Sequence, residues 1–485
     1  ASAINFNPGL AFDGSNDRMD FPSSLGMAGT SPYSVFYIAT NDGANNAPIL
    51  STNATAGAAI NNKIAVVLNT NGTVGNTVAG GGGVCAAETT DAVSVAGEPA
   101  LGTVVRGTAN SIMVNLNGGT AVSGGCTANY VPGNLSIGAR WSGSAYTTFM
   151  NGYVSEIVVY DAELGGVDID KIESYLAVKY GVTLGHNYVA SDGTTLFWTL
   201  GGGYDNDIAG IGRDDGSMLE QKQSKSINSD ALLTIGAGNQ IAATNQANSA
   251  ALTDLQFLAW GNNDGNAAWI AVGAPSTYNL LERQWQVQET GTVGAVKIQL
   301  DVADADFDVP ALSAGSVYYL VYDSNNNDDL SDETPVALTN SSGDLWETST
   351  PVDFADGMEF TFATEVTTPP TITSGSSVSI PENTTVVTTV TASGTAPITY
   401  SIVGGADAAL FTIDENTGAL SFITAPDFEN PTDIGGNNVY DVTVQASNST
   451  GTATLAIAVT VTDAVETPPA VCAAAWIHGA DDNGT

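Results

Sequence analysis

The sequence contains no lysine or arginine after Lys297, although residues 298–485 hold 27 of its 51 carboxylates. With a formal net charge of −40 at pH 7, the chain lacks the cations that neutralise nucleic-acid phosphates, and it is poorly suited to anionic membrane surfaces. The acidic stretch has no basic side chain of its own, so its counter-ions must come from salt, from bound metal ions or from another part of an assembly. We therefore expect an extracellular protein in a salty, divalent-rich medium, with calcium as its cofactor.

Long apolar runs are also missing. No stretch of 18 or more apolar residues occurs, so we predict no membrane span. Residues 1–6 have neither a positively charged nor an apolar signal region. That start is typical of a mature N-terminus after signal removal, and equally of a cytosolic protein without a signal. The composition favours the first alternative, a secreted or cell-surface protein.

Cysteine and histidine are scarce. Of the three cysteines, Cys85 and Cys126 lie in the first β-rich segment and are candidates for one disulfide, the alternative being two buried thiols. Cys472 is then left over, without an assigned role. The two histidines, His186 and His478, are far apart and show no zinc-ligand spacing with the cysteines.

Short strands and turns dominate what is present. The hydrophobic content of 43% supports packed cores, and 485 residues imply roughly two to four domains. Charged residues make up only 13%, while the sequence is rich in glycine, which suits strands joined by many turns. We predict an all-β protein that contains a jelly-roll sandwich, a second β-sandwich-like domain and a C-terminal immunoglobulin-like sandwich.

Residues 1–165 show strand patterns at 35–39, 64–68, 111–116 and 155–160, with a hairpin signal, NGG, at 117–119. The motifs LAFDGSND (residues 10–17), LSIGAR (135–140) and FMNGYVSEI (149–157) resemble the laminin G-like, concanavalin-type jelly roll. That resemblance implies that the last strand returns beside the first. It gives little information about a ligand.

A single helix is predicted for residues 168–180, because Ile169, Ile172 and Leu176 recur at helical spacing. Asp168 is placed to cap its start and Gly181 to end it. We interpret residues 166–181 as a connector helix packed on a sheet edge.

Residues 182–366 read as a second β-rich domain. The motifs NYVASDGTT (187–195), YDNDIAGIGRDD (204–215) and QKQSKS (221–226) resemble a domain that follows laminin G-like domains in large secreted surface proteins of Bacteroidota. The resemblance implies export to the cell surface and gives no activity.

Two similar proline-rich segments, TTPP at 367–370 and ETPP at 466–469, bracket a module of immunoglobulin size at 371–466. Its motifs PEN (381–383), FTIDENTGAL (411–420), DFE (427–429) and VTD (461–463) resemble, in that order, a cadherin repeat. Residues 467–485 are too short for another domain. They either dock on a neighbouring subunit or lead into a longer natural chain.

The acidic loop DSNNNDDLSDE at residues 323–333 is the sharpest local signal for a metal site. Oxygen ligands at alternate positions can turn inward around one hard cation, as in calcium loops of the EF-hand and dockerin type, which it resembles. Asp328 stands where those loops have glycine, and the closing acid comes early; the alternative is a solvated acidic turn. The predicted ligands are Asp323, Asn325, Asn327 and Asp329, with Asp332 or Glu333 closing the shell.

The cadherin resemblance implies a second calcium site at the end of the module. Two family elements are absent: Asp-Ala-Asp is replaced by ASN at 446–448, and the Asp-Asn-Asp linker by AVE at 464–466. Surface acids on a sandwich are therefore the alternative. The positions that match the family ligands are Glu382, Asp427, Glu429 and Asp463.

Signals for catalysis are poor. Asp168, Asp170 and Glu173 imitate the carboxylate clusters of jelly-roll glycosidases, but those acids face a cleft from a strand and these lie on a helix. No phosphate-binding loop or nucleophile elbow occurs, and we interpret His186 as structural. The acidic run at 301–308 reads as a solvated loop. Six aromatic residues have the chemistry to stack on sugars, but most are expected in the core: Trp141, Tyr146, Trp198, Trp260, Trp269 and Trp285.

These features favour a structural or adhesive surface protein over an enzyme. We expect self-association or contact with other surface proteins through edge strands and terminal segments, in a filament or sheath that calcium stabilises. The alternative is a calcium-dependent, lectin-like protein in which the jelly roll binds glycans.

Overall fold

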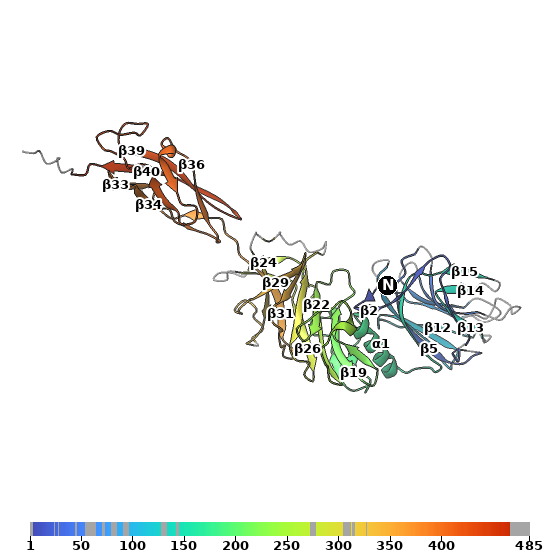
Figure 1. The fold of residues 1–485 in the computed structure, drawn as a ribbon. Coiled ribbons are helices and arrows are strands. Elements are labelled where there is room, and N and C mark those ends of the chain that lie inside the picture. Colours follow the sequence, from blue (N-terminus) through green and yellow to red (C-terminus); the bar gives the residue numbers. More distant parts are fainter. Residues whose placement is uncertain are drawn as a thin grey trace, which may run out of the picture. The chain divides into compact units, whose positions relative to one another are not determined.

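Two compact units make up the computed structural model of the chain. The first comprises Ala1–Ala311 and Ser316–Glu365, and the second includes Val366–Thr485. The structure describes residues 3–465 apart from 24, 28, 44–45, 54–64, 70–72, 79–84, 91–96, 128–132, 142–144, 272–277, 304–311, 313–315 and 326. Strands account for nearly all regular structure in those residues, which confirms the predicted all-β class (Figure 1).

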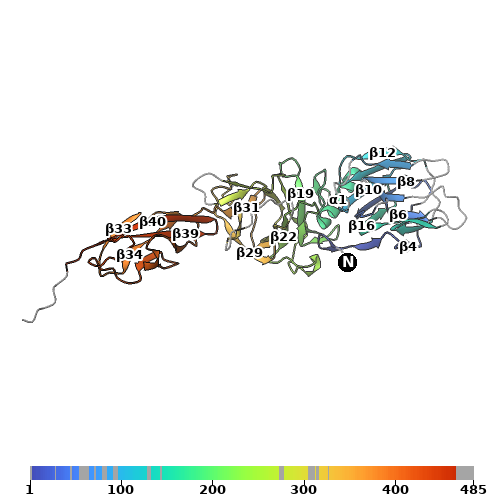
Figure 2. The ribbon, with the colours of Figure 1, turned by 90° about the horizontal axis from the view of Figure 1, so that it is seen from above.

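A jelly roll of two antiparallel six-stranded sheets opens the first unit (Figure 2). The last strand, β16, pairs with β3 near the N-terminus, as the laminin G resemblance implied. One sheet has the order β12 (Val122–Gly125), β11 (Ser111–Leu116), β10 (Ala100–Arg106), β5 (Tyr33–Ala39), β16 (Asn151–Tyr160), β3 (Leu10–Asp13). The other has the order β4 (Met19–Phe21), β13 (Asn134–Ile137), β6 (Ala47–Asn53), β7 (Ala65–Leu68), β8 (Val74–Val78), β9 (Cys85–Glu88). Two small hairpins, β1 (Ala3–Ile4) with β2 (Asn7–Pro8) and β14 (Ala139–Trp141) with β15 (Tyr146–Phe149), complete this part.

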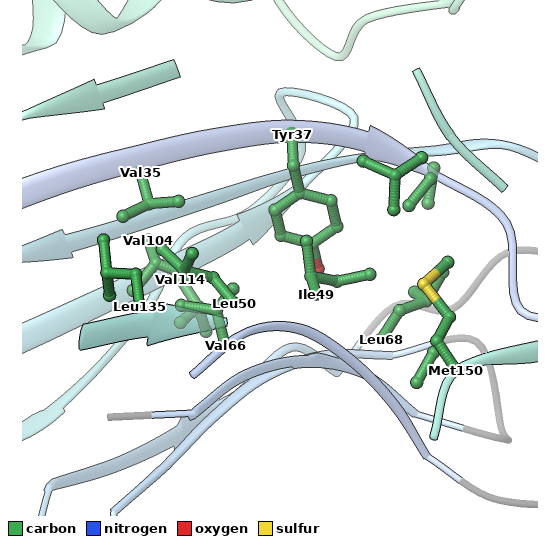
Figure 3. Close-up of a cluster of buried hydrophobic side chains, with 14 of the residues drawn as sticks. Val35, Tyr37, Ile49, Leu50, Val66, Leu68, Val104, Val114, Leu135 and Met150 are labelled. Carbon is green, nitrogen blue, oxygen red and sulfur yellow. The ribbon is translucent and has the colours of Figure 1, made fainter. Parts of the chain in front are cut away.

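Strand β5 is buried on both faces of its sheet. Successive side chains of a strand point to opposite faces. Val35 and Tyr37 therefore enter the core between the two sheets, where they meet Ile49 and Val104 (Figure 3). Phe36 points the other way, into a second core that the jelly roll shares with the following domain.

Cys126 follows β12, is fully buried and is disulfide-bonded. Its predicted partner, Cys85, begins β9, and β9 packs against β12. The side chain of Cys85 and the whole of Cys472 lie outside the described residues, so the Cys85–Cys126 pairing stays a prediction.

Helix α1 (Gly166–Tyr180) begins two residues before the predicted start. Its N-cap is Gly165, which forms no side-chain cap, so the prediction that Asp168 caps the helix is wrong. Asp168 lies inside the first turn, where an acid favours the helix dipole, and pairs with Lys171 at 3.2 Å. The predicted end is confirmed: Gly181 adopts φ 73°, and its N–H donates to the carbonyl of Ala177 at 2.7 Å.

The second domain is built on a 13-stranded antiparallel sheet. The strands that end its path, β20 and β21, are separated by one residue in the sequence, and β21 also packs on β19, so the sheet curls back on itself. The path is β20 (Leu219–Gln221), β19 (Asn206–Asp214), β23 (Gln256–Asn262), β26 (Trp285–Thr290), β31 (Glu359–Glu365), β28 (Tyr318–Tyr322), β29 (Val336–Ser342), β30 (Leu345–Thr348), β27 (Val296–Asp301), β22 (Leu233–Ala237), β21 (Gln223–Lys225). Off this path lie β24 (Trp269–Ala271) and β25 (Tyr278–Leu281), while β17 (Tyr188–Val189) pairs with β18 (Leu196–Trp198) and η1 (Asn245–Ala247) is a short 3-10 helix. Trp198, Trp260 and Trp285 are fully buried here, as predicted for most tryptophans.

The jelly roll, α1 and the second domain share one hydrophobic core. Phe36 and Leu101 of the jelly roll, Leu176 of α1, and Phe197 and Phe257 of the second domain all belong to it. Leu176 is fully buried, and Phe197 stacks on Phe257 with ring centroids 4.2 Å apart. The helix is therefore part of a core that joins two domains, in addition to connecting them in sequence.

The N-terminal hairpin also ties these parts together. Asn5, at its turn with φ 47°, donates to Ser224 Oγ at 2.8 Å and to the carbonyl of Lys179 at 3.3 Å. Its Oδ1 accepts the backbone N–H of Lys225 at 2.8 Å. One side chain thus bridges α1 and the second domain.

The second unit is a sandwich of a four-stranded and a three-stranded sheet around one core. The larger sheet has the order β33 (Ser377–Pro381), β40 (Gly451–Thr462), β39 (Val439–Asn448), β36 (Thr399–Gly404), with β33 parallel to β40. The smaller has the order β34 (Val386–Thr389), β38 (Ala419–Phe422), β37 (Phe411–Ile413); β32 (Thr371–Ile372) pairs with β35 (Ala392–Ser393), and η2 (Ala408–Leu410) is a 3-10 turn.

Candidate functional site

Three of the four carboxylates predicted at the end of the C-terminal module lie together. Glu382, Glu429 and Asp463 each offer a carboxylate oxygen, and these oxygens lie within 4.8 Å of one another. The strand pairing explains the meeting. Because Pro381 of β33 lies opposite Thr462 of the parallel strand β40, the next residue of each strand, Glu382 and Asp463, emerges at the same edge.

Glu382 is only 2% exposed and holds two chain segments. Its Oε1 accepts the backbone N–H of Ala464 at 3.0 Å, and its Oε2 accepts that of Phe428 at 2.8 Å. These hydrogen bonds, the one from Ala464 first, lower the pKa of Glu382 below its ordinary value. The carboxylate is thus ionised and fixed in place, with lone pairs left on both oxygens.

Glu429 is exposed and has a different electrostatic environment. A hydrogen bond from its own backbone N–H lowers the pKa of Glu429. Desolvation and the carboxylates of Glu382, Asp463 and Asp427 raise it by more, so the pKa lies above its ordinary value. Asp427, the fourth predicted ligand, lies beside the group without joining the three, and its Oδ1 caps its own turn by accepting the N–H groups of Glu429 and Asn430 at 3.0 and 3.2 Å. We refer to Glu382, Glu429 and Asp463 as the module-end cluster. It is a concentration of negative charge that any nearby cation would relieve.

The predicted calcium loop at residues 323–333 is closed by its own hydrogen bonds. Asp323 is 3% exposed, and its oxygens accept the N–H groups of Asn327 and Asp328 at 3.2 and 3.0 Å. Asp328 has φ 58°, so it adopts the left-handed conformation for which calcium loops use glycine.

The other acids of this loop face local donors. Glu333 accepts the N–H of Ser324 at 3.0 Å, Asp332 accepts the amide of Asn327 at 3.0 Å, and Asp329 accepts the N–H of Ser331 at 2.9 Å. Among the described residues, no three carboxylates of this loop come within 4.8 Å of one another. Calcium binding by Asp323, Asn325, Asn327, Asp329, Asp332 and Glu333 stays a prediction.

The acidic run at 301–308 is described only at its start. Asp301 lies 3.4 Å from Lys225 Nζ, and Asp304, Asp306 and Asp308 lie outside the described residues.

A cluster of Asp170, Glu173 and His186, which the sequence had offered only as separate residues, lies where α1 meets the jelly roll. Asp170 and Glu173 are one helical turn apart, and His186 returns to them from the loop after the helix, so that ligand atoms of all three lie within 4.8 Å of one another. Glu173 is fully buried; it accepts the hydroxyl hydrogen of Thr103 on β10 and lies 2.8 Å from His186 Nε2. The sequence signal was weak, because Glu173 and His186 are thirteen positions apart and neither lies in a recognised motif.

A polar and aromatic patch occupies the edge of the jelly roll. The guanidinium of Arg18 lies 4.3 Å from the ring centroid of Tyr146 and pairs with Asp20 at 2.9 Å. Asp20 also accepts hydrogen bonds from the hydroxyls of Ser136 and Tyr146 at 2.7 and 2.9 Å. Desolvation raises the pKa of Asp20, but these hydrogen bonds lower it by more, so the pKa lies below its ordinary value. Trp141 meets Tyr146 edge to face at 5.0 Å.

The cations of the first unit are largely paired within it. Eight of the eleven lysines and arginines form an ion pair, and Arg106 is fully buried. One example is Arg283, which is 6% exposed and lies 3.0 Å from Asp230 and 3.6 Å from Asp207. Few cations in the described part of the first unit are therefore left to neutralise acids elsewhere.

Comparison with known families gives one match. Residues 168–358 match a family model described as a domain of unknown function, DUF8202. That range begins in α1 and covers less than half of the chain. No curated protein matches the chain in sequence.

Solved structures give distant similarities of fold. A heptameric SAP-like pentraxin from Limulus polyphemus is 17% identical, over 34% of this chain and 82% of that one, with a TM-score of 0.28. The LG4-5 domains of the mouse laminin alpha1 chain are 12% identical, over 32% and 44% of the two chains, with a TM-score of 0.25. The binding domain of botulinum neurotoxin DC, in a complex with rat synaptotagmin II, is 9% identical, over 75% and 88%, with a TM-score of 0.32. With all three TM-scores below 0.5, we base no functional conclusion on them.

Proposed function

We propose that this protein is an extracellular adhesive or structural surface protein, a repeating subunit of a filament or sheath, that calcium stabilises at the end of its C-terminal module. The observation that carries the proposal is the module-end cluster, in which three of the four carboxylates that the cadherin resemblance implied lie within 4.8 Å of one another.

The donor set fits calcium. Calcium takes six to eight oxygen ligands in flexible geometry, and carboxylates bind it through one or both oxygens. Glu382, Glu429 and Asp463 offer six carboxylate oxygens, and Glu382 is already fixed by two backbone N–H groups. Calcium would be held by these three residues and would join the end of β40 to the turn after β33 and to the loop that carries Glu429. It supplies charge neutralisation and a mechanical link between these segments.

The charge distribution supports the same conclusion. Residues 366–485 contain no lysine or arginine, and most cations of the first unit are paired inside it. The acids of the second unit therefore depend on dissolved cations. An extracellular medium supplies millimolar calcium, which matches the weak affinities of extracellular calcium modules.

The disulfide supports an extracellular location. Cys126 is disulfide-bonded, and disulfides persist in oxidising compartments. In the part of the chain that the structure describes, no helix is long and apolar enough to cross a membrane.

Self-association has a structural basis in the open sheets of the second unit. Strand β36 ends one side of the four-stranded sheet and β33 the other, so each has one edge that pairs with no other strand of the described residues. Edge strands accept a further strand from another chain.

The test is assembly of the full chain with and without calcium. Sedimentation velocity and negative-stain microscopy are carried out in 10 mM calcium and in EDTA, with magnesium as the control ion. We expect ordered oligomers or fibres in calcium that dissociate in EDTA. A monomer that is identical in both buffers and binds no surface would contradict the proposal.

A glycan-binding role is the second candidate, favoured by the jelly-roll patch of Arg18, Asp20, Trp141 and Tyr146. Aromatic rings stack on sugar faces, while a charged pair fixes hydroxyl groups. A glycan array with calcium present tests it, with Tyr146→Ala as the matched variant. Binding that Tyr146→Ala abolishes would support a lectin, and an array without signal would exclude it.

A further inference from the structure

The cluster of Asp170, Glu173 and His186 is built like a metal site. His186 Nδ1 lies 2.8 Å from the carbonyl oxygen of Asn187, an acceptor, so Nδ1 carries the hydrogen. In the neutral ring, Nε2 then presents its lone pair to Glu173 Oε2, 2.8 Å away. Two lone pairs at that distance require a positive ion between them, which is either a shared proton or a metal ion that both atoms bind.

The neighbours of the cluster match the outer contacts of metal ligands. A ligating histidine usually donates its other N–H to a carbonyl or carboxylate, and a ligating carboxylate is itself hydrogen-bonded. Here His186 donates to Asn187, and Glu173 accepts from Thr103. Both contacts come from groups outside the cluster and hold its members in their observed orientations.

The charge balance points to a divalent ion. Asp170 is half-buried, and no donor among the described residues forms a hydrogen bond with its carboxylate. The nearest lysines on α1 are engaged elsewhere: Lys171 pairs with Asp168, and Lys179 pairs with Glu156. A proton on His186 would leave the cluster with one negative charge, whereas a divalent ion with neutral imidazole leaves none.

We propose that Asp170, Glu173 and His186 bind a divalent transition metal, best matched by zinc, at the junction of the jelly roll and the second domain. One imidazole nitrogen with two carboxylate oxygens suits zinc, while calcium takes oxygen ligands only. Zinc bonds of about 2.0–2.2 Å place the ligand atoms of a tetrahedral site about 3.3 Å apart. Binding therefore requires His186 Nε2 and Glu173 Oε2, now 2.8 Å apart, to separate by about half an ångström. His186 and Asp170 are partly exposed, which leaves a path for the ion and room for a water ligand.

The bound ion would connect three segments of the chain. Glu173 is tied to β10 through Thr103, and His186 rests on Gly118, where an added Cβ would lie 2.6 Å from the imidazole Cδ2. Gly118 has φ 63°, and Gly185 donates to the carbonyl of Asn117 at 3.0 Å beside it. Zinc is thereby expected to stabilise the first unit, independently of calcium at the second.

The experiment is a zinc titration of the full chain by isothermal calorimetry at pH 7.5. Metals are first removed with EDTA, and the buffer then contains 10 mM calcium, which occupies sites made of oxygen ligands alone. We expect one equivalent of zinc that binds the wild type at least tenfold more tightly than it binds His186→Gln. The matched control is His478→Gln, which removes the other imidazole of the chain and should leave the affinity unchanged. Cobalt gives a second readout, since a bound nitrogen ligand changes its visible absorption.

Two milder variants keep the test valid if His186→Gln fails to fold. Asp170→Asn changes a partly exposed side chain and should weaken zinc at least tenfold, and Thr103→Val should weaken it roughly tenfold through loss of the contact to Glu173. Glu382→Gln should leave zinc binding intact, so this result is independent of the calcium proposal. Equal zinc binding by wild type and His186→Gln, or no zinc binding by the wild type, would overturn the assignment and leave a protonated His186–Glu173 pair.

Discussion

The hydroxyl of Thr103, on strand β10 of the jelly roll, donates to the buried carboxylate of Glu173 on α1. This contact crosses the boundary that sequence patterns placed between the first domain and the helix. It lies beside the shared core in which Leu176 packs between the jelly roll and the second domain. The junction of the jelly roll, α1 and the second domain is thus held by a shared core and by polar contacts beside it.

A cavity in that core should destabilise both domains together. Leu176 is fully buried, and Leu176→Ala should cost about 2–5 kcal/mol of unfolding free energy. Differential scanning calorimetry should show one transition for the first unit, displaced as a whole. The control is Val167→Ala on the same helix, where the side chain is 60% exposed and the cost should stay within about 0.5 kcal/mol. Two separate transitions, with only one displaced, would show that the domains do not share a core.

Reduction should destabilise the jelly roll. Cys126 is disulfide-bonded and buried, and loss of a native disulfide costs about 2–5 kcal/mol. Peptide mapping without reductant should recover a Cys85–Cys126 linked pair, and Cys126→Ser should lower the midpoint of thermal unfolding. Recovery of Cys126 linked to Cys472 would refute the predicted pairing.

Acid should weaken the second domain through Asp192. Its oxygens accept the N–H groups of Thr194 and Thr195 at 2.9 and 2.8 Å, together with both hydroxyls, and these bonds, the Thr195 hydroxyl first, lower its pKa far below the ordinary value. Because the pKa of Asp192 is depressed in the folded state, its ionised carboxylate stabilises the fold fully above the pKa of about 3.9 that it has in the unfolded chain. This stabilisation is lost as the pH falls below that pKa toward the folded one. Asp192→Asn should remove this part of the pH dependence, so that its acid-unfolding curve is less steep below pH 4. An identical slope in both proteins would contradict the prediction.

Local patterns predicted the strands with a clear apolar run or alternation, and family motifs predicted the three carboxylates of the module-end cluster. Alternating residues such as those at 455–461 identify strands because burial on one face imposes a period of two. Glu382 and Asp463 were found because family motifs place them at strand ends, and the parallel pairing of β33 with β40 then brings them together. Asp168 was misplaced as a cap because the two glycines before it are compatible with helix as well as with loop.

Contacts between segments that are far apart in the sequence could not be predicted from it. The pairing of Glu173 with His186 depends on the path of the chain after Gly181, and the contact with Thr103 depends on how the helix docks on β10. Neither choice leaves a period or a motif in the sequence. In the loop at 323–333 the sequence does contain a pattern, but the pattern is ambiguous. Its oxygen-rich side chains can bind a cation or accept hydrogen bonds within the loop, as they do here.

Calcium binding at the module-end cluster is the claim most directly open to measurement. Hydrogen–deuterium exchange of the full chain is followed at 380–384, 426–430 and 462–465, in calcium and in EDTA, for wild type and Glu429→Gln. Calcium at about 100 times its Kd should stabilise the second unit by about 2.7 kcal/mol, which slows exchange in these segments about 100-fold if they open with the unit. Glu429→Gln removes one ligand charge and keeps the backbone hydrogen bonds of Glu382 from Phe428 and Ala464, and it should reduce the effect at least tenfold. Exchange in these segments that is the same with calcium and with EDTA would contradict the account.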